Sequence, residues 1–406
     1  FLTLESCCRS FSLSYPLRRT AMCDTSDFKN ERAENDYSLS YIEFYAGVGG
    51  WTMALQEALC EFGGDKPFLK RLAAYDHSDL CLNVLEHNFP SQKNSKKRKL
   101  ISPVDITRLT VSQMQDFSAD IWVMSPPCQP HTRQHDKQDR DMLDPRSQSF
   151  LHLCKVLKEM SRDKLPKILL MENVVGFEAS SSCFNWRKAL QQHNYCVAHF
   201  HLNPTQVGLP NDRPRYFCMA ILKEVILKSD CRDELLKWLS IETDLDKPII
   251  IQTELSEWKI SPIDIVSDLP SISKFLDEGE GDLTTSLQVP AKVLDSSASW
   301  CFDIVTPSDK RSSCFTSAYG KYIRGTGSVL YTGTGNIPSL AQPEERKFQE
   351  QWKDGISDVY EQLRYFSGKE LARLFGFPPS FSFPSTCTTK QEWKLVGNSL
   401  NVRVAA

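Results

Sequence analysis

The ten residues Tyr-Ile-Glu-Phe-Tyr-Ala-Gly-Val-Gly-Gly, positions 41–50, decide the fold class. The aromatic and β-branched residues of the first half are typical of a strand, and the glycines that follow permit a tight turn. From Trp51 to Phe62 apolar residues recur at helical spacing. A strand, a glycine turn and a helix in this order indicate the start of a parallel α/β sheet.

The same alternation continues along the first half of the chain. Further strands are predicted at Arg71–Tyr75, Asp120–Met124, Lys167–Met171 and Tyr216–Leu222, and helices at Ser78–Asn88, with Ser78 as N-cap, and around Phe150–Met160. Strands that are apolar on both faces and alternate with amphipathic helices predict a Rossmann-like sheet with helices on both faces.

The unusual residues follow the predicted strands. They are Gly47-Val48-Gly49-Gly50, Asp76, Pro126-Pro127-Cys128 and Glu172-Asn173-Val174. Ligands of such sheets bind outside the carboxyl ends of the strands, so these four turns predict one shared cleft.

The alternation weakens after Leu222, and this sets the predicted domain boundaries. We expect residues 1–39 to be a disordered or non-native extension, 40–222 a catalytic domain, 223–361 a smaller domain, and 362–406 a segment that returns to the catalytic domain. A helix is predicted at Gly368–Phe375, and the chain is expected to stop at Ala406 within a further helix, as a truncated sequence would.

Composition narrows the possible functions. A net charge of −3 argues against a broad phosphate-binding surface, and no stretch is apolar enough for a membrane helix. The basic run at positions 96–99 is more simply a solvated loop. Fourteen cysteines without a Cys-x-x-Cys pair or zinc spacing predict reduced thiols, no metal site, and a cytoplasmic location with nuclear presence also considered.

Cys128 is the predicted nucleophile. Two prolines precede it, and their fixed φ angles stiffen the loop and direct the thiol outward. Ionising the thiol requires a nearby cation, for which Arg213 and Arg215 are candidates because Pro214 holds both on an extended segment. The alternative is a buried structural thiol.

The other candidates also have structural alternatives. Asp76 is predicted to bind ribose hydroxyls, although a Gly-x-Gly-Gly turn is often only a tight connection. Glu172 is predicted to face the cleft, although it could equally cap a helix or pair with an arginine. Arg213 and Arg215 could be ordinary surface charges.

Five motifs together resemble the cytosine-C5 methyltransferase family, in content and in order. They are Phe44–Gly50, Ser125–Pro130, Glu172–Val174, Arg213–Phe217 and Gly397–Ser399. Within the family the chain is most similar to the eukaryotic tRNA-aspartate cytosine-5 methyltransferases, through Cys314-Phe315-Thr316 and the glycines of 325–327. Two residues depart from their pattern: Arg324 replaces an acidic residue and His131 an aromatic one.

The resemblance implies a class I methyltransferase sheet and a target-recognition domain. It implies transfer of a methyl group from S-adenosylmethionine, leaving S-adenosylhomocysteine, to C5 of cytosine 38 in the anticodon loop of tRNA-Asp. The implied catalytic residues are Cys128, Glu172, Arg213 and Arg215. The implied cofactor-binding residues are Phe44, Gly47, Val48, Gly49, Gly50, Trp51, Asp76, His77, Asp105, Ile106, Ser125, Asn398 and Ser399, and the substrate-recognition residues are Cys314, Phe315 and Thr316.

Two other functions stay open. The same residues serve methylation of DNA cytosine, and the fold also suits a nucleic-acid-binding homologue with impaired catalysis. We expect a monomer with a tRNA substrate, and weak DNA binding is kept as an alternative.

Overall fold

The computed structural model describes residues 38–61, 68–90, 101–103, 105–127, 145–242, 244–253, 269–277, 286–296, 298–333 and 362–406. They form two compact units. Unit 1 contains the chain up to Leu202, then Pro214–Leu255 and the last two residues, and unit 2 contains Asn203–Arg213 and Ser256–Val404. The predicted extension lies outside the described residues up to position 37, and the first strand begins at Ser38.

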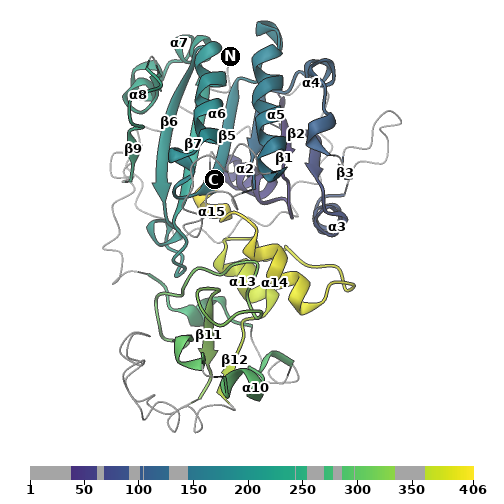
Figure 1. Cartoon of the computed structure of the whole chain (residues 1–406), viewed down its shortest axis with the longest axis vertical. Helices are drawn as coiled ribbons and strands as arrows, with labels where there is room; N and C mark the ends of the chain where they lie inside the picture. The colour runs from purple at the N-terminus through teal and green to yellow at the C-terminus, as the bar shows by residue number, and fades with distance from the viewer. Residues whose placement is uncertain are drawn as a thin grey trace. The chain divides into compact units, whose positions relative to one another are not determined.

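Unit 1 is built on a sheet of nine strands (Figure 1). The strands are β1 (Ser38–Phe44), β2 (Phe68–Asp76), β3 (Ile101–Pro103), β4 (Ile121–Met124), β5 (Ile168–Val174), β6 (Tyr195–Leu202), β7 (Arg215–Leu222), β8 (Ser240–Ile241) and β9 (Ile251–Gln252). The order along the sheet is β3-β2-β1-β4-β5-β7-β6-β8, with β9 paired to β6. Strands β1 to β5 are mutually parallel, and β7 enters antiparallel between β5 and β6.

Helices connect these strands. They are α2 (Gly50–Glu61), α3 (Asp79–Asn88), α4 (Val111–Phe117), α5 (Pro145–Glu159), α6 (Ser181–Gln192), α7 (Lys223–Leu227) and α8 (Arg232–Trp238), with 3-10 turns at Ile106–Arg108, Arg162–Lys164 and Phe177–Ala179. The predicted N-cap is confirmed: Ser78 Oγ accepts from the Cys81 N–H at 3.4 Å. No helix in the described part of the chain is long and apolar enough to cross a membrane.

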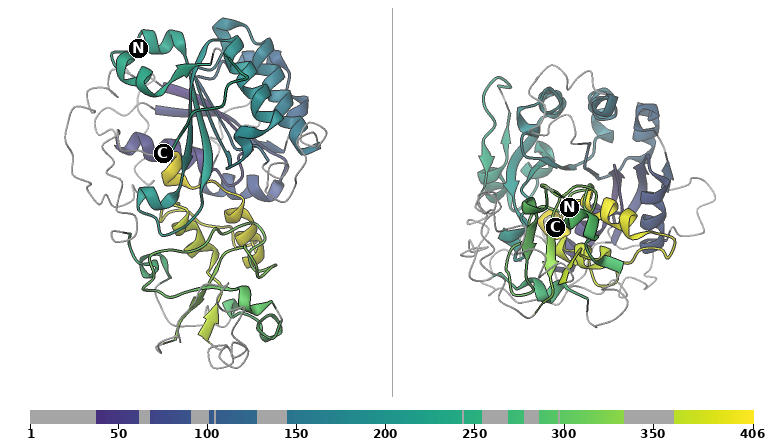
Figure 2. Two further views of the ribbon diagram at one scale, coloured as in Figure 1. Left: turned by 60° about the vertical axis from the view of Figure 1, so that its left-hand side comes forward. Right: turned by 60° about the horizontal axis from the view of Figure 1, so that its bottom comes forward.

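The largest core of unit 1 lies between the sheet and helices α4, α5 and α6. Trp122 of β4, Phe150 of α5 and Trp186 of α6 are fully buried there. A smaller cluster on Ala74 and Leu85 belongs to the side of α3. Figure 1 shows α5 and α6 in front of the sheet, and Figure 2 shows the twist of its strands. Helices on both faces of a mainly parallel sheet confirm the predicted fold class.

Unit 2 has a three-stranded sheet of β10 (Asp303–Val305), β11 (Ser328–Tyr331) and β12 (Leu363–Arg364), in the order β10-β11-β12. Its helices are α10 (Ala291–Leu294), α13 (Gly368–Leu374), α14 (Thr389–Gly397) and α15 (Val402–Ala405), with 3-10 turns at Pro204–Val207, Ile272–Phe275 and Ser299–Cys301.

The units divide the chain differently from the predicted domains. Residues 223–255 belong to unit 1, because β8 and β9 both pair with β6 at the edge of its sheet. Most of 362–406 belongs to unit 2, because β12 pairs with β11 and α13 packs on α14. Two-residue strands carry too little sequence pattern to be predicted.

The cysteine prediction is correct in most described positions and wrong in one. Eight described cysteines are free thiols, whereas Cys231 is disulfide-bonded. Pairing depends on which thiols the fold brings within reach, and spacing along a chain does not reveal that.

Candidate active site

The carboxylate of Asp76, at the end of β2, holds the glycine turn that follows β1. The Gly47 N–H donates to Asp76 Oδ2 at 2.9 Å, and the Ser78 N–H donates to Asp76 Oδ1 at 2.9 Å. Gly47 and Gly49 adopt left-handed φ angles of +53° and +91°. A Cβ on Gly49 would lie 2.5 Å from Leu85 Cδ1, whereas one on Gly47 would meet no atom within 4 Å. The turn is therefore closed toward α3 and open in front of Gly47.

A second carboxylate, Glu43 in β1, caps the helix that the turn leads into. The Trp51 N–H donates to Glu43 Oε1 at 3.1 Å, and the Thr52 hydroxyl donates to Glu43 Oε2 at 2.6 Å. Glu43 is fully buried, and this burial raises its pKa to about 7 although the Thr52 hydrogen bond lowers it. The contact satisfies N–H groups at the start of α2 that would otherwise lack partners.

The loop after β4 is held by contacts from helix α2 and from strand β5. Trp51 Nε1 donates to Ser125 Oγ at 3.0 Å, and Asn173 Nδ2 donates to the Pro126 carbonyl at 3.3 Å. These contacts fix the chain as far as Pro127. Cys128, the predicted nucleophile, lies outside the described residues, as does His131.

Glu172 and Arg215 form an ion pair between β5 and β7. Arg215 Nε lies 3.3 Å from Glu172 Oε1, and both side chains are largely buried, with 16% and 10% of their surfaces exposed. Glu172 was expected in a turn after its strand, but β5 continues to Val174 because β7 pairs with it to the end. The pairing with an arginine that was the structural alternative for Glu172 is therefore present.

The polar side chains of this edge project from one face of the sheet. Neighbouring residues on a strand point to opposite faces. Phe44, Tyr75, Met124, Met171 and Tyr216 all belong to the core beneath α5 and α6. Their neighbours Glu43, Asp76, Ser125, Glu172 and Arg215 therefore face the other way, at the carboxyl ends of the parallel strands or, for Arg215, at the start of β7 beside the end of β5.

Arg213 occupies a different place, inside unit 2. Its Nη1 donates to the Phe315 carbonyl at 2.8 Å, and its Nη2 donates to the carbonyls of Gly397 and Ser399 at 3.1 and 2.7 Å. The guanidinium carbon lies 4.7 Å from the ring centre of Phe375, and Arg213 is 3% exposed. One buried cation therefore joins three segments that are far apart in the sequence.

The joined segments are close-packed. A Cβ on Gly397 would lie 2.3 Å from the carbonyl carbon of Thr316, so only glycine fits at that position. Phe315 is fully buried against Tyr319 and Phe366. Cys314-Phe315-Thr316 and Gly397-Asn398-Ser399 are thus parts of one packed structure.

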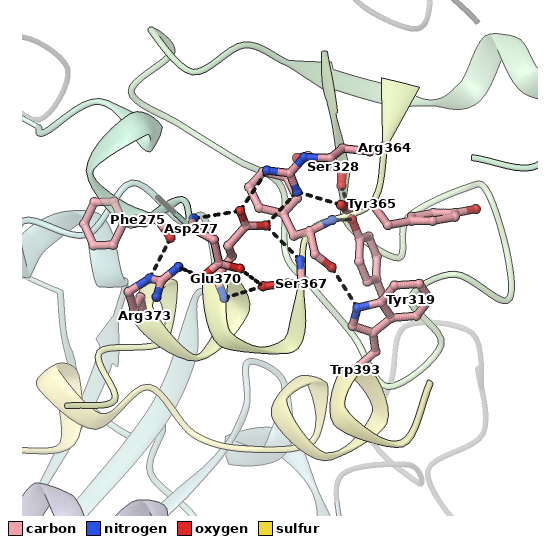
Figure 3. Close-up of polar contacts among 11 residues, drawn as sticks. Phe275, Asp277, Tyr319, Ser328, Arg364, Tyr365, Ser367, Glu370, Arg373 and Trp393 are labelled. Atoms are coloured by element: carbon pink, nitrogen blue, oxygen red, sulfur yellow. Dashed lines mark hydrogen bonds and ion pairs between the residues drawn. The ribbon is translucent and has the colours of Figure 1, made fainter. Parts of the chain in front are cut away.

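A network of ion pairs stabilises the same unit around α13 (Figure 3). Arg364 donates twice to Glu370, at 2.7 Å each, and Ser367 donates its N–H to Glu370 and its hydroxyl to Asp277. Arg373 donates to Asp277 at 2.5 Å. These contacts join the start of α13 to the segment around Asp277.

A family model for C-5 cytosine-specific DNA methylases matches residues 39–406. The chain belongs to this family. It is 33% identical to the human tRNA (cytosine(38)-C(5))-methyltransferase, over 91% of this chain and 97% of that one. It is 32% identical to a DNA (cytosine-5)-methyltransferase of Dictyostelium discoideum, over 91% and 92%. A solved structure of a Spodoptera frugiperda DNMT2 mutant superposes with a TM-score of 0.68 at 30% identity, over 91% and 97%.

These matches confirm the predicted family, fold class and enzyme class. Members of the family are cytosine-C5 methyltransferases, and the five motifs on which the resemblance rested all lie within the matched residues. The structure distributes the methylase motifs between its units. The glycine turn, Asp76, Ser125, Glu172 and Arg215 belong to unit 1, and Arg213 with the motifs at 314–316 and 397–399 belongs to unit 2.

Several predicted cofactor-binding residues have side chains that a ligand could not reach as the structure stands. Phe44 is fully buried against Tyr75 and Trp122, and Val48 and Ile106 are buried at 1% and 4% exposure. Their apolar side chains pack in the fold, so a ligand could contact these residues only through their backbone.

Other predicted residues are accessible. His77 is 93% exposed, with Nδ1 3.4 Å from Asp76 Oδ1. Asp105 is exposed and accepts from the Thr107 N–H at 3.0 Å. Hydrogen bonds from the Thr107 side chain and from this N–H lower the pKa of Asp105. Asp105 comes just after β3, and Asp76 is the last residue of β2. Both carboxylates therefore lie at the same edge of the sheet.

Sequence reasoning missed two residues that organise the site. Glu43 lies in the stretch 41–50, where it is a carboxylate among apolar residues. That pattern was the available signal for a buried polar contact. Phe375 was predicted only as part of a helix, and nothing in its pattern indicates that it packs on Arg213. Among the described residues no cluster of His, Cys, Asp and Glu could hold a metal ion.

Replacing Gly49 with alanine is expected to destabilise the protein more than replacing Gly47. Both substitutions strain a left-handed residue, at a cost of about 1 kcal/mol, but only the Gly49 methyl meets the buried Leu85 side chain. Chemical unfolding should show a loss of about 2–3 kcal/mol for Gly49→Ala and about 1 kcal/mol for Gly47→Ala. Equal losses would contradict the close approach of the turn to α3.

Glu43→Gln is expected to change how stability depends on pH. Because the folded pKa of Glu43 is raised to about 7, its contribution to stability is present below pH 4.5 and is lost as the pH rises through 7. Between pH 5 and pH 8 the wild type should lose about 2 kcal/mol relative to the variant, which imitates the protonated acid. Urea unfolding of both proteins at the two pH values measures this, and a constant difference would refute it.

Arg213→Lys is expected to destabilise unit 2 by about 3 kcal/mol, because the single nitrogen of an ammonium cannot reach all three carbonyls that the two guanidinium nitrogens contact. The control is Arg311→Lys in the same unit, since the exposed Arg311–Asp212 pair should contribute less than about 1 kcal/mol. Hydrogen exchange should rise at 314–316 and 397–399 in the Arg213 variant alone. Unchanged exchange there would mean that Arg213 does not hold these segments together.

Proposed function

We propose that this chain transfers a methyl group from S-adenosylmethionine to C5 of a cytosine in tRNA, at position 38 of the anticodon loop and with tRNA-Asp as a substrate. The observation that carries the proposal is the similarity to the human tRNA (cytosine(38)-C(5))-methyltransferase, which extends over 97% of that enzyme. The polar edge of the sheet in unit 1 supplies residue types suited to the chemistry.

The glycine turn fits the methyl donor. Open space in front of Gly47, and the two carboxylates Asp76 and Asp105 that follow adjacent strands, suit a nucleoside with ribose hydroxyls and an adenine edge. Trp51 and Ser125 border the same turn. S-adenosylmethionine supplies an electrophilic methyl group there and leaves as S-adenosylhomocysteine. Asn398 and Ser399 stay candidate cofactor-binding residues.

Cys128 is the proposed nucleophile, and Glu172 is the proposed hydrogen-bond partner of the target cytosine. The thiolate adds to C6 of cytosine, the electron pair moves to C5, and C5 takes the methyl group. Loss of the C5 proton to a base then restores the double bond as the C6–S bond breaks and releases the thiolate. Glu172 hydrogen-bonds the ring at N3 as charge develops, and Arg215 orients Glu172 through the 3.3 Å contact.

The target base must leave its stack before it reacts. A cytosine in an RNA loop is already partly unstacked, so presenting it costs less than flipping one from a duplex.

We propose that the protein is a monomer in the cytoplasm, with access to the nucleus. The free thiols of eight described cysteines favour a reducing compartment, whereas the disulfide of Cys231 does not.

Methylation of DNA is the second candidate. It is favoured by the 32% identity to a protein named DNA (cytosine-5)-methyltransferase. The catalytic residues required are the same, so only the substrate separates the two functions.

Labelled methyl transfer to a tRNA pool and to duplex DNA, measured side by side, tests the proposal. The wild type should methylate tRNA at least 100-fold faster than DNA, Cys128→Ala should lose all activity, and Glu172→Gln should lose about 100-fold or more. Cys387→Ala, which removes a partly exposed thiol, is the matched control and should keep full activity. Preference for DNA, or activity in the Cys128 variant, would overturn the proposal.

A further inference from the structure

A loop of unit 2 presents one aromatic ring and two cations to solvent. The ring of Tyr322 is 60% exposed. Lys321 Nζ lies 5.0 Å from the centre of that ring. Arg324 is exposed and makes no hydrogen bond or ion pair with the described residues. The exposed Tyr322 ring and the two exposed cations are not required for packing of the core. Their exposure indicates a role in binding.

The loop is rigid although its tip is exposed. The Lys321 and Tyr322 N–H groups donate to the Ala318 carbonyl at 2.9 and 3.3 Å, and the Thr326 hydroxyl donates to the Tyr322 carbonyl at 2.6 Å. The Thr316 N–H closes the base of the loop on the Thr326 carbonyl at 3.0 Å. Tyr322 is therefore held in place by backbone contacts on both sides.

Two glycines lock the base of the loop onto the core of unit 2. Gly320 adopts a φ of +70°, and a Cβ there would lie 2.3 Å from the Trp393 ring. Gly327 adopts a φ of +138°, and a Cβ there would lie 2.4 Å from the Phe315 ring. A rigid loop loses little conformational entropy when a ligand binds, which favours a role in recognition.

The charge of this segment differs from that of the chain. Residues 310–327 contain Lys310, Arg311, Lys321 and Arg324 and no Asp or Glu, whereas the whole chain has a net charge of −3. Arg311 pairs with Asp212, so the cations at the tip are Lys321 and Arg324. A local positive potential of this kind attracts phosphates.

We propose that Tyr322 stacks on an unpaired base of the RNA substrate, while Lys321 and Arg324 contact the phosphates on either side of it. The inference rests on the proposed function and adds a substrate-binding surface to it. A planar π surface flanked by cations is the arrangement that single-stranded nucleic acid recognises, because every base offers a face for stacking.

The experiment compares binding of two RNAs of equal length, a hairpin with a seven-base loop and a perfect duplex. Tyr322→Ala should weaken hairpin binding about tenfold and leave duplex binding unchanged, while Tyr322→Phe should bind like the wild type. Lys321→Ala and Arg324→Ala should each lower the slope of log K against log salt by about 1 for both RNAs. Phe184→Ala, an exposed aromatic of unit 1, and Lys292→Ala, an exposed lysine of unit 2, are the controls and should change nothing.

Base stacking has its own readout. A hairpin series with 2-aminopurine at each loop position should show quenching at one position with the wild type and Tyr322→Phe, and none with Tyr322→Ala. Melting temperatures of the variants should match the wild type, because the substituted side chains are exposed.

The outcomes separate this inference from the proposed function. If the wild type methylates tRNA but Tyr322→Ala binds the hairpin as tightly, only the inference is wrong. If the wild type neither methylates nor binds RNA, the proposed function fails and the inference fails with it. Equal loss of hairpin and duplex binding in Tyr322→Ala would also overturn stacking on an unpaired base.

Discussion

The site in unit 1 depends on two carboxylates that accept hydrogen bonds from the glycine turn and from the start of α2. Asp76 binds the Gly47 and Ser78 N–H groups, and the buried Glu43 caps the start of α2. Together they fix where the glycine turn leaves the sheet, and Trp51 then fixes the loop after β4 through Ser125. The backbone at this edge is consequently held in place without a ligand, which is what preorganised binding at the proposed site requires.

Unit 2 is held by the buried cation Arg213 as well as by the ion pairs around α13. Arg213 binds carbonyls of two segments and packs on the Phe375 ring, and this joins motifs that lie nearly 200 positions apart in the sequence. The structure gives Arg213 a positioning contact that the sequence interpretation, in which it was a catalytic residue, did not include. Arg215, two positions later, forms an ion pair with Glu172, and its catalytic role stays a prediction.

The sequence predicted the parts of the fold that depend on local pattern. The parallel strands, the cap at Ser78 and the polar strand ends were all visible, because period, turn glycines and caps are local features. The pairing of β8 and β9 with β6, the contacts of Arg213 and the disulfide of Cys231 were not, because each depends on segments that only the folded chain brings together. Phe44 was predicted as a cofactor-binding residue from its motif, but its side chain belongs to the core.

Cys128 acting as a covalent nucleophile toward RNA cytosine is the central claim, and trapping the adduct tests it most directly. A tRNA anticodon hairpin with 5-fluorocytosine at the target position cannot lose its C5 substituent as a proton, so the adduct should persist. With S-adenosylmethionine present, we predict a complex that survives denaturation, with peptide mass spectrometry placing the RNA on Cys128. A complex that maps to another residue, or none while methyl transfer to ordinary cytosine proceeds, would contradict the account.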